Sequence, residues 1–101
     1  MIIAAAAAPP ACYAAPRAFY AGHLRKDAEI IVVTDGPYAY TSWYDKGGGG
    51  SGGEGLFQRR GERWCKVVNG GGAMSRAEIE HYGVPPAIAR RLFEKMRRAR
   101  G

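Results

Sequence analysis

Residues 29–44 read EIIVVTDGPYAYTSWY, and this stretch decides the fold. The β-branched run at residues 30–33 is typical of a buried strand. Asp35-Gly36-Pro37 then predicts a turn. The following residues alternate between two faces, which predicts a second strand of period two. One face carries Tyr38, Tyr40, Ser42 and Tyr44, and the other carries Ala39, Thr41 and Trp43.

A second hairpin is expected further along the chain. Residues 56–60 and 63–68 flank the turn dipeptide Gly61-Glu62. With the first hairpin they predict a four-stranded antiparallel meander. Residues 47–55 between the two hairpins read GGGGSGGEG, a composition typical of flexible coil. We therefore expect a long glycine-rich loop at 47–55.

Local signals predict a helical hairpin after the strands. Ser75 and Glu78 have the spacing of a capping box, which indicates a helix start. Gly83 ends that helix, and Pro85-Pro86 suits the opening of a second one. Apolar side chains recur there at helical spacing, namely Ile88, Ala89, Leu92, Phe93 and Met96. The sequence thus predicts an α+β fold, a meander followed by a helical hairpin.

The length of 101 residues fits one domain. Residues 1–16 are mainly Ala and Pro, so we expect an extended Ala/Pro-rich arm or leader over 1–28 and one domain over 29–101. No basic residue precedes the first apolar run, and Pro9-Pro10 interrupts it, so it is not interpreted as a signal peptide. No apolar run reaches the roughly 20 residues that span a bilayer. The compartment stays open, with the cytoplasm favoured.

Charge is distributed unevenly along the chain. The net charge is +6, and residues 1–50 contribute four basic and four acidic side chains, so the excess lies in the second half. The last helix should carry a basic face, made of Arg90, Arg91, Lys95, Arg97 and Arg98. The second hairpin could extend it through Arg59, Arg60 and Arg63. Such a face attracts acidic protein surfaces, nucleic acid or anionic lipid.

No residue pattern points to catalysis. Cys65 with His81 is the one conceivable nucleophile pair, but Cys65 lies beside Trp64 in an expected strand and is interpreted as a small buried thiol. A disulfide from Cys65 to Cys12 would need an oxidising compartment and remains open. The two histidines are isolated, and no phosphate-binding motif is present. We expect no catalytic residue, metal, cofactor or small-molecule substrate.

The helical hairpin resembles two DNA-binding motifs. Gly83, Val84, Ala89 and Leu92 match the helix-hairpin-helix pattern, but Pro85 stands where that pattern has its second glycine. The helix-turn-helix pattern also places a Gly-Val turn between two helices. A plain helical hairpin packed on the sheet is the favoured interpretation.

A broader resemblance covers about Ile30–Met96. Its residues are Tyr38-Ala39, Trp43, Gly61, Trp64, Val67-Val68, the segment 70–74 and Gly83-Val84-Pro85. This order is similar to small domains of cyanobacterial proteins that have no assigned activity. The resemblance implies a sheet-plus-hairpin fold and no reaction.

These observations favour a non-catalytic protein-interaction module, an accessory subunit of a larger assembly. It would dock through the N-terminal arm and the basic C-terminal helix. The alternative is a nucleic-acid-binding protein that uses the same helix and the Arg-rich hairpin. A role at an anionic membrane surface is less favoured, because the last helix has few bulky apolar residues.

Overall fold

The computed structural model describes residues 11–22, 24, 28–45 and 51–101. These residues form an α+β fold, as the sequence predicts. The elements are β1 (Cys12–Tyr13), α1 (Pro16–Ala21), β2 (Glu29–Asp35), β3 (Tyr38–Asp45), β4 (Ser51–Arg60), β5 (Arg63–Gly71), α2 (Arg76–His81) and α3 (Pro86–Arg100).

The strands form one antiparallel sheet in the order β1-β5-β4-β3-β2. Both expected hairpins are present, with Asp35 opposite Tyr38 and Arg60 opposite Arg63. Gly36 and Gly61 stand in the two turns with φ of 56° and 62°, a region that favours glycine. Two tight turns therefore define the two hairpins, and the hairpins pair with each other through β3 and β4.

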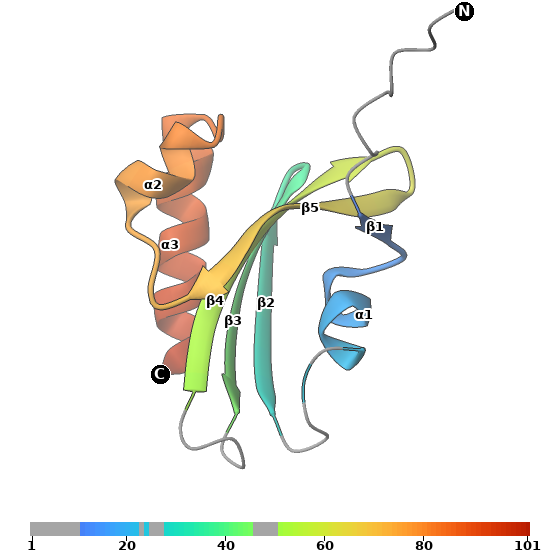
Figure 1. Ribbon diagram of the computed structural model, residues 1–101. Helices are drawn as coiled ribbons and strands as arrows, with labels where there is room; N and C mark the ends of the chain where they lie inside the picture. Colours follow the sequence, from blue (N-terminus) through green and yellow to red (C-terminus); the bar gives the residue numbers. More distant parts are fainter. Residues whose placement is uncertain (1–10, 23, 25–27, 46–50) are drawn as a thin grey trace, which may run out of the picture.

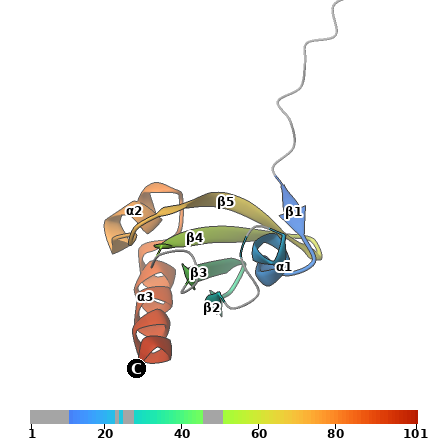
Figure 2. The ribbon, with the colours of Figure 1, turned by 60° about the horizontal axis from the view of Figure 1, so that its bottom comes forward.

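Helices cover both faces of the sheet (Figures 1 and 2). α2 and α3 pack on the face that carries Tyr40 and Leu56, and with them they bury Ile79, Leu92 and Met96. On the opposite face α1 buries Phe19 and Tyr20 against Ala39 and Phe57. The two clusters confirm the alternation read from residues 38–44.

Three expectations differ from the structure. The sheet has five strands rather than four, because Cys12–Tyr13 pairs with β5. The expected extended arm is wrong for its described part, where Pro16–Ala21 is a helix that packs on the sheet; residues 1–10 lie outside the described residues. The expected loop at 47–55 is wrong for residues 51–55, which belong to β4, and 47–50 lie outside the described residues.

Two glycines of β4 make room for large side chains on the α1 face. A Cβ on Gly53 would lie 2.0 Å from the carbonyl oxygen of Gly70 and 2.9 Å from the Trp43 ring. A Cβ on Gly55 would lie 2.8 Å from the Tyr20 hydroxyl. That hydroxyl is 2.6 Å from Thr41 Oγ1 and donates to Asn69 Oδ1 at 2.8 Å. Glycine is therefore needed at both positions because the neighbouring groups leave no space for a side chain.

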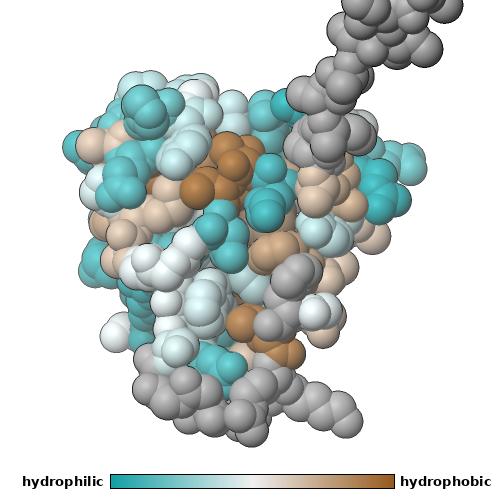
Figure 3. Space-filling view, viewed as in Figure 1, coloured by the Kyte–Doolittle hydropathy of each residue, from teal (hydrophilic) through white to brown (hydrophobic). Residues whose placement is uncertain are grey.

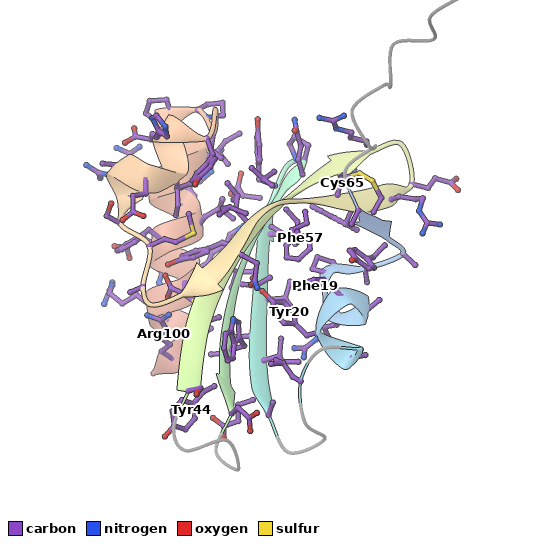
Figure 4. The ribbon with its side chains drawn as sticks, viewed as in Figure 1. Phe19, Tyr20, Tyr44, Phe57, Cys65 and Arg100 are labelled. Carbon is purple, nitrogen blue, oxygen red and sulfur yellow. A yellow bond between two sulfur atoms is a disulfide. The ribbon has the colours of Figure 1, made fainter. Side chains whose placement is uncertain are left out.

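A disulfide joins β1 to β5. Cys12 and Cys65 lie opposite each other in the register and are bonded through their sulfur atoms. The yellow sulfur–sulfur bond is visible beside Cys65 in Figure 4. The interpretation of Cys65 as a buried thiol is therefore corrected. The pairing was beyond sequence reasoning because 53 residues separate the two cysteines.

Candidate interaction surface

The basic residues expected on the last helix all lie on α3. Pro86 stands at its first turn, where the missing amide hydrogen costs no helical hydrogen bond. One side of α3 buries Ala89, Leu92 and Met96 against the sheet. Arg90, Arg91, Lys95, Arg97 and Arg98 are all exposed. The helix is therefore amphipathic with a basic outer side, as its spacing predicts.

Two of these cations are held by Asp35 at the end of β2. The Arg91 guanidinium donates to both carboxylate oxygens, at 2.9 and 3.0 Å. Lys95 Nζ donates to Asp35 Oδ2 at 3.2 Å and to the carbonyl oxygen of Thr34 at 2.6 Å. The hydrogen bond from Arg91 is the main cause that lowers the pKa of Asp35 to about 2. Arg91 and Lys95 thus fasten α3 to the β2–β3 turn.

Two further cations of α3 pair with other acidic residues. Arg97 donates to Glu94 at 2.7 Å. Arg100, labelled at the end of α3 in Figure 4, donates to Glu54 and, at 3.1 Å, to Ser42 Oγ. The contacts of Arg100 join the last turn of α3 to β3 and β4, whereas the pair of Arg97 with Glu94 lies within the helix.

Glu54 is a buried carboxylate that the sequence did not single out. Its side chain is 3% exposed and accepts hydrogen bonds from the Tyr40 hydroxyl, Arg100 and, at 2.5 Å, the backbone N–H of Met74. Burial, followed by the hydrogen bond to Glu54, raises the pKa of Tyr40. Glu54 therefore links β4 to β3, to α3 and to the segment before α2. Its partners lie far away in sequence, so only the fold reveals this role.

Two cations of α3 remain without a counter-ion. Among the described residues, Arg90 and Arg98 have no ion pair. A shallow hollow of about 290 Å³ lies on the same side and is lined by Arg90, Arg91, Glu94, Lys95 and Arg98. This side of α3 is the strongest candidate for a charged contact, and we call its four basic residues, Arg90, Arg91, Lys95 and Arg98, the α3 basic face.

The Arg-rich hairpin does not extend the α3 basic face. The turn between β4 and β5 lies on the side of β1 and α1, away from α3 (Figures 1 and 2). Arg59 lies over the Trp64 ring, with its guanidinium carbon 5.9 Å from the ring centre. Arg63 donates to the carbonyl oxygen of Cys12 at 3.1 Å. The eight expected contact residues therefore form two separate groups, and Arg60 belongs to the second of them.

Apolar surface is scattered. The large side chains that stay exposed are Tyr44, Val67, Tyr82 and Phe93. On the face shown in Figure 3, hydrophobic residues form small patches separated by hydrophilic residues. Tyr38, Tyr40 and Tyr44 share one face of β3 but form no exposed aromatic row, because Tyr40 is buried and Tyr38 packs against the core on the α3 side.

Neither a metal site nor a membrane-spanning helix is found in the described residues. They include no group of three His, Cys, Asp or Glu side chains placed to hold a metal ion. None of the helices in these residues is both long and apolar enough to cross a membrane. Comparisons with protein families, with curated proteins and with solved structures give no match.

Proposed function

We propose that this protein is a non-catalytic protein-interaction module, an accessory subunit that docks on an acidic surface of a larger assembly. The supporting observation is the pair Arg90 and Arg98, exposed and without an ion pair among the described residues. Their neighbours Arg91 and Lys95 are paired with Asp35, which joins α3 to the end of β2. A helix that is already joined to the sheet and presents cations without a counter-ion among the described residues needs little ordering on binding, which favours docking.

The experiment is a pull-down from native extract with the tagged full chain, with and without nuclease. The test variant is Arg90→Glu with Arg98→Glu, and the control is Arg17→Glu on α1. We expect a discrete protein that survives nuclease, is retained by the control and is lost from the double variant. Capture that is equal for all three chains would contradict the proposal.

Nucleic-acid binding is the alternative outcome. It would use the same α3 residues together with Arg59, Arg60 and Arg63, which lie away from α3 (Figure 2). Recovery that disappears with nuclease and falls steeply with salt would replace the proposal with this alternative. Retention on anionic lipid vesicles would instead indicate a membrane surface.

A further inference from the structure

The outer edge of β2 is unpaired among the described residues. β2 is the last strand of the sheet and pairs only with β3 in that part of the chain (Figure 2). Its sequence, EIIVVTD, contains no proline and no charge between its ends. Natural edge strands usually carry such features to prevent pairing with another chain.

The hydrogen-bond pattern identifies which residues face outward. Backbone groups of an antiparallel strand point alternately toward and away from the neighbouring strand. The carbonyl oxygen of Thr34 accepts from Lys95 of α3 and so points away from β3. By alternation, the N–H and C=O groups of Ile30 and Val32 also point outward. Among the described residues, the outward backbone groups of Ile30 and Val32 have no strand beside them to pair with.

Positive charge lies beside this edge. Arg91, Lys95 and Arg98 follow one another at the spacing of one helical face. Arg91 and Lys95 contact Asp35 and Thr34, so this face of α3 lies beside the end of the β2 edge. A strand added to β2 would place alternate side chains next to these cations.

We infer that the β2 edge binds an extended acidic segment of the partner, which adds as a sixth strand with its carboxylates against Arg91, Lys95 and Arg98. This inference rests on the proposed function and names the mode of docking. Backbone hydrogen bonds to β2 supply affinity, and the cations select acidic side chains.

Charge argues against a second copy as the occupant. Two β2 strands that pair antiparallel are related by a twofold axis perpendicular to the sheet, so both α3 helices lie on the same face. The two rows of Arg91, Lys95 and Arg98 would then lie near each other and repel. An acidic strand meets no such repulsion.

The test uses synthetic peptides and fluorescence anisotropy. The probe is a fluorescein-labelled nine-residue peptide of alternating Glu and Thr, and its control carries Lys in place of Glu. Two further peptides are N-methylated on one or the other set of alternate residues. In an added strand only one set donates to β2, so we expect one methylated peptide to bind about tenfold or more weakly and the other to bind like the parent. Equal binding of both would overturn the inference.

Protein variants separate the edge from the charge. Thr34→Pro removes an outward N–H at an exposed position, whereas Thr34→Ala keeps that donor, so we expect only the proline variant to lose binding. Arg98→Glu should weaken the acidic peptide, and Arg17→Glu should leave it unchanged. Binding that depends on Arg98 but not on N-methylation or on Thr34→Pro would overturn strand addition and leave the proposed function standing. The same holds if a charge-dependent partner is captured while no acidic peptide binds.

Discussion

At the scale of single residues, glycine has two different roles in this chain. Gly36 and Gly61 permit the turns, and their positions next to Asp35 and Glu62 were readable in the sequence. Gly53 and Gly55 instead leave space for Trp43 and Tyr20. The sequence could not distinguish a glycine needed for packing from a loop glycine, because the neighbours that leave no room for a Cβ come from other strands and from α1.

Alanine substitution tests this second role. Gly53→Ala forces its Cβ against the backbone of β5, so the strands must shift and the free energy of unfolding should fall by about 3 kcal/mol. Gly70→Ala is the matched control, since a Cβ there meets no atom within 4 Å. Urea denaturation measures both. If both variants lost the same small amount of unfolding free energy, β4 would not be packed against β5 in this register.

Asp35 predicts a pH dependence of stability. Its folded pKa is lowered to about 2 by Arg91 and Lys95, whereas an unfolded Asp titrates near about 3.9. A lowered folded pKa stabilises above the unfolded value, and that contribution is lost as the pH falls through about 2. The wild type should therefore be more stable than Asp35→Asn at pH 6, and the difference should shrink from pH 4 to pH 2. Denaturation curves at several pH values measure it, and a constant difference would contradict the ion pair.

At the scale of elements, local signals were sufficient for most of the fold. The capping box at Ser75 and Glu78 forms as expected, with reciprocal bonds of 3.1 and 3.2 Å. The α3 pattern correctly places Ala89, Leu92 and Met96 in the core, whereas Phe93, expected on the same apolar side, is exposed. β1 escaped prediction because two residues have no measurable periodicity, and α1 was hidden in an Ala/Pro-rich stretch.

The disulfide fixes β1 to the sheet, which predicts a response to reductant. Closing a loop of this length lowers the conformational entropy of the unfolded chain. This loss raises the free energy of the unfolded state by about 4 kcal/mol. Reduction of the wild type, or replacement of both Cys12 and Cys65 by Ser, should lower the free energy of unfolding by about 2–4 kcal/mol. The double variant should no longer respond to reductant. A wild type that is equally stable with and without reductant would contradict this role.

Glu54 links four parts of the chain, so its charge should matter for stability. Glu54→Gln removes the buried charge that meets Arg100 and weakens the bond from Met74. We expect a loss of about 2 kcal/mol by thermal or urea unfolding. Glu62→Gln, in an exposed turn, should change little. If Glu54→Gln left the free energy of unfolding unchanged, the contacts of Glu54 would not be what holds α3 in place.

At the scale of the whole molecule, some cations of α3 pair with acidic residues of the fold and others stay exposed to solvent. The six cations of residues 90–100 looked like one patch in the sequence. Asp35, Glu94 and Glu54 pair with four of them, namely Arg91, Lys95, Arg97 and Arg100. The sequence could not show this, because two of the three acidic residues come from other elements. It also could not show that the Arg-rich hairpin lies apart from α3.

The central claim is that α3 contacts an acidic protein, and site-specific photo-crosslinking tests it most directly. A photoreactive amino acid replaces Arg98 in one chain and Arg17 of α1 in another, and each is irradiated in native extract. We predict a crosslinked protein adduct from position 98 that resists nuclease, and no such adduct from position 17. An adduct from position 98 that nuclease removes, or equal adducts from both positions, would contradict the claim.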